Sequence, residues 1–146
     1  MKDIEYSYCV IRYVHDPVAG ESLNLGVVLC APAVSFCTVS IEYRYERLAQ
    51  AFVNFDGEHF KRTMWQLESA INEVSTSSLV QPIQDVEALR LRVWPDNDLS
   101  YQFGPMLVGL TDDPADEVER LFDRMVLSQQ PRQLAERHAG ELVWAD

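Results

Sequence analysis

The sequence predicts an α+β fold: a mostly antiparallel sheet of about five strands, with two or three helices packed on it. Two observations carry this prediction. Short strand-like apolar runs separated by turns occupy the first forty or so positions, and apolar residues recur every three or four positions between residues 45 and 74, as in helices. Strands and helices are therefore clustered along the chain instead of alternating one for one, which argues against a doubly wound parallel sheet.

Three strands are expected in the N-terminal part. Residues 4–13 are apolar on both alternating faces, which is typical of a central strand. A turn-rich loop over 15–22 separates them from a second strand at 23–30, and an Ala-Pro-Ala turn leads to a third strand at about 35–42. Short links between successive strands predict an antiparallel meander.

Two helices follow. Tyr45, Leu48 and Phe52 fall at helical spacing, and Asp56 is a plausible N-cap for a longer helix whose apolar positions run from Phe60 to Val74.

The C-terminal third begins with a predicted hairpin. Apolar residues alternate over 88–94, a turn follows at 95–98, and alternation resumes over 99–103. Asp113-Pro114 then combines a cap with a first-turn proline and predicts a helix, and 131–139 predicts a last short one.

Composition limits the classes of function. The chain of 146 residues is expected to be a single domain over 1–146, and its 47% hydrophobic and 24% charged residues are ordinary for a globular protein. Its formal net charge of −11 disfavours nucleic acids and anionic membranes, because both are polyanions. No apolar stretch approaches the roughly 18 residues of a membrane span, and the start of the chain does not resemble a signal peptide.

The cysteines favour a reducing compartment. Cys9, Cys30 and Cys37 lie in or beside apolar strand-like runs and are not spaced as a metal-binding pair. We expect buried free thiols and a cytoplasmic protein.

The segment from Tyr6 to Leu29 is the densest in polar residues placed among apolar ones. Arg12, Asp16, Glu21 and Asn24 are expected to gather near the first hairpin, where they would bind a polar ligand or dock a partner. The alternative is structural: Arg12 pairs with Asp16 or Glu21, and Asn24 satisfies loop backbone groups. Gly26 inside a strand predicts a close approach, which we expect from a side chain such as Tyr6 or Tyr8.

Catalytic signatures are weak. His15, Asp16 and Glu21 would suit a divalent metal or acid–base work, but His59 and His138 fall in other predicted helices. No nucleophile motif and no glycine-rich phosphate loop is present, and Cys9 lies within an apolar strand. The sequence therefore predicts no catalytic residue, no metal and no cofactor.

A second candidate is a basic patch. Arg90, Arg92 and Trp94 would share one face of the predicted strand at 88–94, as in an anion or nucleic-acid surface with aromatic stacking. The acidic net charge favours a plain solvated face, with the arginines paired to local acids.

The run YSYCVIRYVHDPVAGESLNLGVVL, with Asp113-Pro114 and the VERLFDRMV that follows, resembles a bacterial family catalogued as domain of unknown function 3037. The matching pieces are Arg12-Tyr13, Asp16-Pro17, Gly20-Glu21, Asn24 and Gly26-Val27-Val28. The resemblance would cover essentially the whole chain, but it carries no established activity and no catalytic residue. It implies a companion of HipA-like kinase proteins, in a toxin–antitoxin or defence-type cassette. His15 stands where many relatives would have a proline, which argues against chemistry based on His15.

Two classes of function follow. The sequence favours a non-enzymatic interaction or regulatory module with a protein partner, for which the resemblance suggests a HipA-like kinase. The alternative is a small metal-dependent hydrolase or nuclease that uses Asp16 and Glu21 of the hairpin loop.

Overall fold

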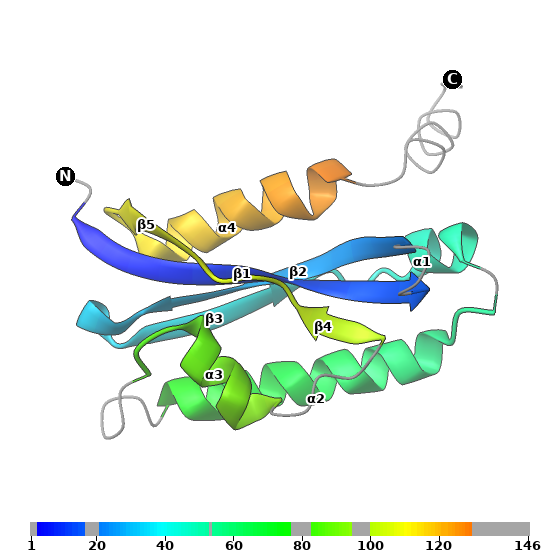
Figure 1. Cartoon of the computed structure of the whole chain (residues 1–146), viewed down its shortest axis with the longest axis horizontal. Helices are drawn as coiled ribbons and strands as arrows, with labels where there is room; N and C mark the ends of the chain where they lie inside the picture. The colour runs from blue at the N-terminus through cyan, green and yellow to red at the C-terminus, as the bar shows by residue number, and fades with distance from the viewer. Residues whose placement is uncertain (1–2, 17–20, 53, 77–82, 95–99, 130–146) are drawn as a thin grey trace.

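The computed structural model describes residues 3–16, 21–52, 54–76, 83–94 and 100–129 (Figure 1). Within them the chain forms an antiparallel five-stranded sheet with helices on both faces, so the predicted α+β class is confirmed. The elements in order are β1 (Ile4–Asp16), β2 (Glu21–Ala31), the 3-10 turn η1 (Pro32–Val34), β3 (Phe36–Ile41), α1 (Glu46–Ala51), α2 (Gly57–Thr76), α3 (Val86–Val93), β4 (Tyr101–Phe103), β5 (Leu107–Thr111), α4 (Pro114–Met125) and the 3-10 turn η2 (Leu127–Gln129).

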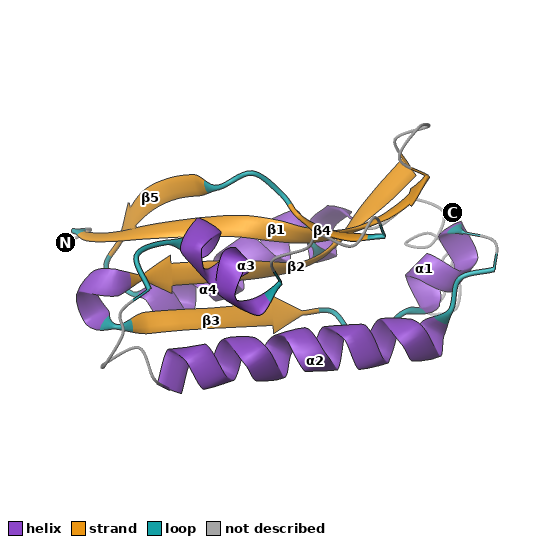
Figure 2. Ribbon diagram, turned by 60° about the horizontal axis from the view of Figure 1, so that its bottom comes forward, coloured by secondary structure: helices purple, strands orange, loops and turns teal. Residues whose placement is uncertain are grey.

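The long strand β1 is the centre of the sheet. One of its edges pairs with β2, which in turn pairs with β3. Its other edge is shared by two short strands: β4 pairs with residues 11–13 of β1, and β5 pairs with residues 4–8. All of these pairings are antiparallel, and Figure 2 shows β4 and β5 following one another along the same side of β1. The expected three-stranded meander is confirmed.

The sheet lies between two helical layers (Figure 1). On one face, α2 and α3 cover a large core that includes Cys9, Ile11 and Leu25. On the other face, α4 packs against a smaller cluster through Val118, Leu121 and neighbouring residues. Residues of β1 alternate between the two cores because successive side chains of a strand point to opposite faces, which is why both of its faces read as apolar.

One predicted strand is wrong. The segment expected as a strand over 88–94 is the helix α3, which begins after the N-cap Asp85, whose side chain accepts a hydrogen bond from the Ala88 amide. Val86 and Leu89 are the buried residues of this helix, three positions apart, whereas Leu91 is exposed. The alternation of Leu89, Leu91 and Val93 that suggested a strand does not match the burial.

A strand that the sequence did not predict takes its place in the sheet. β5 follows Gly104-Pro105 and contains Gly109. Of its five residues, only Thr111 is buried. Because the exposed residues of β5 are apolar, the strand lacks the alternation of buried apolar and exposed polar residues by which a strand is recognised in sequence. The turn predicted at 95–98 and the helix predicted at 131–139 lie outside the described residues.

The remaining elements agree with the expectations. The two helices expected after residue 45 are α1 and α2, and all of Cys9, Cys30 and Cys37 are buried free thiols. The buried face of α2 consists of Phe60, Met64, Leu67, Ile71 and Val74, as its spacing predicts. In the part of the chain that is described, no helix is long and apolar enough to cross a membrane.

The start of α4 provides a test of the helix cap formed by Asp113. Asp113 caps the helix by accepting a hydrogen bond from the Asp116 amide, and its neighbour Asp112 makes no such bond in the described structure. We expect Asp113→Ala to lower the free energy of unfolding by about 1 kcal/mol, because an orphan helix amide loses its acceptor. Asp112→Ala, with the same change of charge, is the control. Urea titrations followed by circular dichroism would measure both, and equal effects would contradict the cap.

Candidate functional site

The hairpin formed by β1 and β2 brings together the positions that the sequence singled out. Arg12 pairs with Asn24 across the ladder, and Asp16 pairs with Glu21 at its end. An irregularity between Ile11 and Arg12 leaves Leu25 without a partner, so that β2 has one residue more than β1 there. The side chains of Asp16 and Glu21, and the loop residues 17–20, lie outside the described structure. Whether Arg12 pairs with either acid therefore stays a prediction.

Arg12 is held against the neighbouring strand. A Cβ placed on Gly104 would lie 2.7 Å from the Arg12 Nη2, so the guanidinium occupies the space that the glycine leaves free. The Arg12 Nε is buried and meets no hydrogen-bond acceptor among the described residues. This packing ties β1 to the link between β4 and β5.

Asn24 serves the fold. Its side-chain amide donates a 2.8 Å hydrogen bond to the carbonyl oxygen of Met125, the last residue of α4. The final carbonyls of a helix have no partner inside the helix, so this bond satisfies one of them. The structural alternative assigns Asn24 to loop backbone groups; this bond adds a helix end about a hundred residues away in sequence.

Gly26 marks a close approach, but of a different group from the one expected. A Cβ at this position would lie 2.6 Å from the backbone oxygen of Ser40 in β3, and not against Tyr6 or Tyr8. The Glu42 amide also donates to the Leu25 oxygen, which draws β3 onto β2 beside the irregularity. Glycine is required here by the neighbouring backbone.

The metal alternative gains no support within the described residues. No group of three His, Cys, Asp or Glu residues there could hold a metal ion. His15 stacks on the Phe52 ring at 4.5 Å, and its Nδ1 lies 2.9 Å from the Tyr13 hydroxyl. A nucleophilic Cys9 is also disfavoured, because burial raises the pKa of its thiol to about 12.

The basic patch does not form on a shared face. Arg90 and Arg92 lie two positions apart on the helix α3, so they point to different sides of it, and the strand face expected for them is wrong. Arg90 is ion-paired with Glu87 at 2.7 Å. Trp94 follows the helix and turns inward, with its ring edge-on to Phe103 at 6.0 Å.

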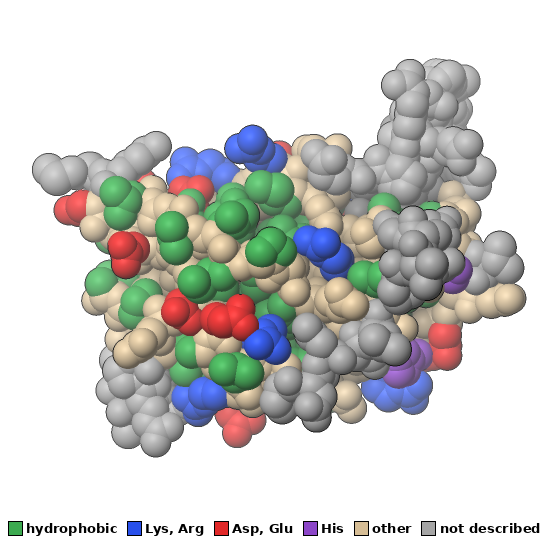
Figure 3. All heavy atoms as spheres, viewed as in Figure 1, with side chains coloured by type: hydrophobic (Ala, Val, Ile, Leu, Met, Phe, Trp, Pro, Cys, Tyr) green, Lys and Arg blue, Asp and Glu red, His purple; other side chains and the backbone are tan. Residues whose placement is uncertain are grey.

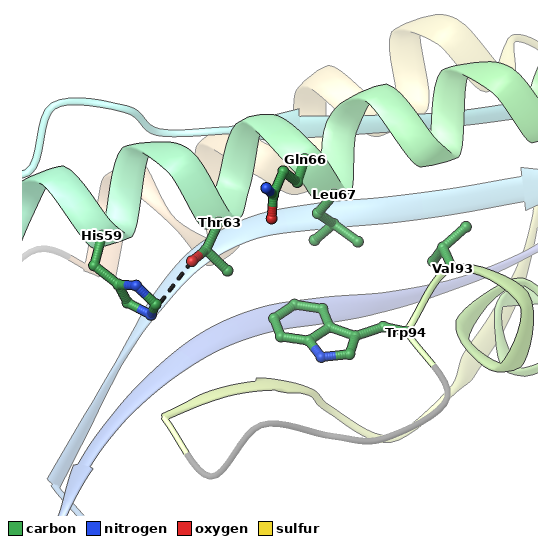
Figure 4. A pocket seen from close by; sticks show the side chains of 6 residues that line it. All are labelled: His59, Thr63, Gln66, Leu67, Val93 and Trp94. Carbon is green, nitrogen blue, oxygen red and sulfur yellow. Dashed lines mark hydrogen bonds between the residues drawn. The ribbon is translucent and has the colours of Figure 1, made fainter.

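Trp94 instead forms one wall of a cavity of about 370 Å³ beside α2. Figure 4 shows the polar side chains of His59, Thr63 and Gln66 descending from α2 on one side, with the indole opposite them. His59 and Thr63 are joined by a long 3.4 Å contact. The described lining carries no Lys, Arg, Asp or Glu, so it offers hydrogen bonds but no formal charge.

The surface that sequence reasoning missed is β5. Met106, Leu107, Val108 and Leu110, which we call the apolar edge, are all exposed, and Val108 is 70% exposed. Leu91 of α3 is exposed as well. Figure 3 shows apolar side chains gathered over the face that carries β5 and α3. Exposed apolar side chains gathered in one segment are typical of interaction sites.

The backbone of β5 is also open on one side. The Gly104 amide donates to the Val10 oxygen and the Val14 amide donates to the Ser100 oxygen, so the even residues of β1 direct their backbone groups toward β4 and β5. Their partners in β5 are Leu107, Gly109 and Thr111. Because directions alternate along a strand, the N–H and C=O groups of Val108 and Leu110 point away from β1.

Gly26 gives a direct test of the structural role of the hairpin residues. Gly26→Ala would force its Cβ against the Ser40 oxygen, so we expect it to lower the free energy of unfolding by about 2 kcal/mol or more. Ser22→Ala, at an exposed position of the same strand, is the control and should stay within about 0.5 kcal/mol of wild type. Thermal unfolding would compare them. A Gly26→Ala protein as stable as wild type would mean that the glycine is not needed for packing.

Comparison with known proteins agrees with the resemblance seen in the sequence. The model of one family, described as a protein of unknown function (DUF3037), matches residues 8–126. This range includes most of β1, the strands β2 to β5 and the helices α1 to α4. No curated protein and no solved structure matches. The match spans most of the 146 residues, and the chain therefore belongs to the DUF3037 family of proteins of unknown function.

Proposed function

We propose that this protein is a non-enzymatic interaction module that binds another protein through the apolar edge. The observation that carries the proposal is the exposure of Val108 and Leu110 together with their outward-facing backbone groups. Edge strands are usually guarded by charged residues, prolines or bulges, because an open edge pairs readily with another chain. Between Leu107 and Leu110 this strand has none of these.

The proposal also rests on how the residues suited to chemistry are placed. Cys9 is buried in the core, and the ring of His15 is stacked on the ring of Phe52. In the cavity beside α2, His59 and Thr63 lie together, but the described lining holds no acidic side chain to orient the imidazole, as a catalytic triad requires. The apolar edge, by contrast, is an accessible surface of one chemical character.

The partner suggested by the family resemblance is a HipA-like kinase. A kinase partner would make the module a regulatory subunit, with the apolar edge as its contact surface. The hairpin of Arg12, Asp16, Glu21 and Asn24 is the competing docking surface that the sequence suggests, and the two surfaces are separable by mutation.

The experiment compares three variants. We expect Leu110→Lys to weaken partner binding by at least about tenfold, because it places a charge in the apolar contact. Trp65→Lys is the matched control, since Trp65 is 65% exposed on the solvent side of α2 and should bind normally. Glu21→Ala reports on the hairpin. Affinity isolation from native cells with mass spectrometry, and calorimetric titration with a HipA-like kinase of the same organism, would measure binding.

Each result has a defined meaning. A partner retained by Trp65→Lys and lost by Leu110→Lys supports the apolar edge. A partner retained by Leu110→Lys but lost by Glu21→Ala places docking on the hairpin and contradicts the proposed surface. Recovery of the protein alone in every form contradicts the interaction module itself.

A further inference from the structure

We infer that the partner docks by strand addition: an extended segment of it, with alternating apolar residues and flanking lysines or arginines, pairs with the outer side of β5. This inference rests on the proposed function and specifies the chemistry of the occupant.

The backbone claim follows from the ladder. β5 pairs with β1 alone among the described strands, and no other described backbone hydrogen bond reaches Val108 or Leu110. These two residues therefore present two donors and two acceptors to an incoming strand. The five residues of β5 span about 17 Å, so the segment that pairs with them is itself about five residues long.

The side-chain claim follows from the register. Val108 and Leu110 are the β1 register partners of Ser7 and Glu5, so their side chains lie on the face of the sheet that carries α3. A cavity of about 120 Å³ lies at this face, lined in part by Ser7, Met106 and Val108. Alternate side chains of an added strand would point toward this apolar surface, as in other cases of strand addition.

The charge claim follows from the acidic residues around β5, which are Glu5, Asp85 and Asp112 and which we call the rim. Glu5 and Asp85 line the same cavity, whose described lining includes no lysine or arginine, and Asp112 follows β5 directly. Arg90 of α3 and Arg120 of α4 are each ion-paired with acids of their own helix. The rim is therefore acidic, and a segment with basic flanks is its electrostatic complement.

The same rim argues against a second copy of this chain as the occupant. A copy paired edge to edge would bring its own Glu5, Asp85 and Asp112 to the contact, and each molecule carries a formal net charge of −11. Like charges placed opposite one another oppose association. A heterologous basic segment meets no such repulsion.

The test begins with a random library of about twelve-residue peptides displayed on phage and panned against the full chain. We expect enriched peptides to alternate apolar residues and to carry lysine or arginine at their ends, as a strand of about five residues with basic flanks requires. Apolar residues enriched at intervals of three and four would indicate a helix and overturn strand addition. Failure to enrich any peptide relative to the Val108→Pro protein would overturn it as well.

The backbone is then tested with the best enriched peptide. Val108→Pro removes an amide that points outward while leaving those of Leu107 and Gly109 for β1, and proline is tolerated at such edge positions. We expect it to weaken binding by about tenfold, whereas Val108→Ala, which keeps the amide, should weaken it by less than about threefold. Equal effects of the two substitutions would overturn the backbone claim.

A measurement on the wild-type protein covers the case in which Val108→Pro does not fold. Amide exchange followed by NMR should show that the Val108 and Leu110 amides become protected when the peptide binds, while those of Leu107 and Gly109 are protected already. Binding without this new protection would overturn strand addition but would leave an apolar contact, and so the proposed function, intact.

Charge and stoichiometry complete the test. Raising the salt from about 50 mM to about 500 mM should weaken peptide binding several-fold, and Glu5→Gln with Asp112→Asn should remove much of that dependence. Salt-independent binding would overturn the basic flanks. A stable wild-type dimer that Val108→Pro dissociates would overturn the inference in favour of a second copy.

Discussion

The two-sided ladder of β1 is the constraint on which the rest of the structure depends. β1 bonds to β2 along one edge and to β4 and β5 along the other, and its side chains enter both cores. Because its period is two, a shift of one residue would exchange the residues facing α2 with those facing α4. The irregularity at Leu25, the close approach at Gly26 and the bond from Asn24 to α4 all fix the register near its C-terminal end.

The sequence predicts those elements whose pattern matches their burial. The elements β1 to β3, α2 and α4 are predictable because their apolar residues repeat with the period of the element that buries them. α3 resembles a strand in sequence because the exposed Leu91 fills out an alternation with Leu89 and Val93, whereas the residues that meet the core, Val86, Leu89 and Val93, follow helical spacing after the cap Asp85. β5 gave no pattern, since Val108 and Leu110 are apolar without being buried.

The candidate site shows the same division. The sequence places Arg12 and Asn24 near the same hairpin because a hairpin sets its two arms side by side, and the ladder then shows the two residues opposite one another. It could not say what Gly26 or Asn24 contacts, because both contacts come from segments distant in sequence: Ser40 of β3 and the end of α4. The apolar edge was missed for a physical reason: exposure is a property of the fold, and a sequence pattern reports only polarity.

The unguarded strand also has a consequence for the isolated protein. In the isolated protein, the open side of β5 is a template for edge-to-edge aggregation, and the formal net charge of −11 is a barrier that keeps two molecules apart. This electrostatic repulsion acts over a shorter range as salt is added: the screening length falls from about 8 Å at physiological ionic strength to about 3 Å in 1 M salt. The chain should therefore be most soluble in dilute buffer. Concentrated salt, which keeps many other proteins in solution, would promote precipitation of this one.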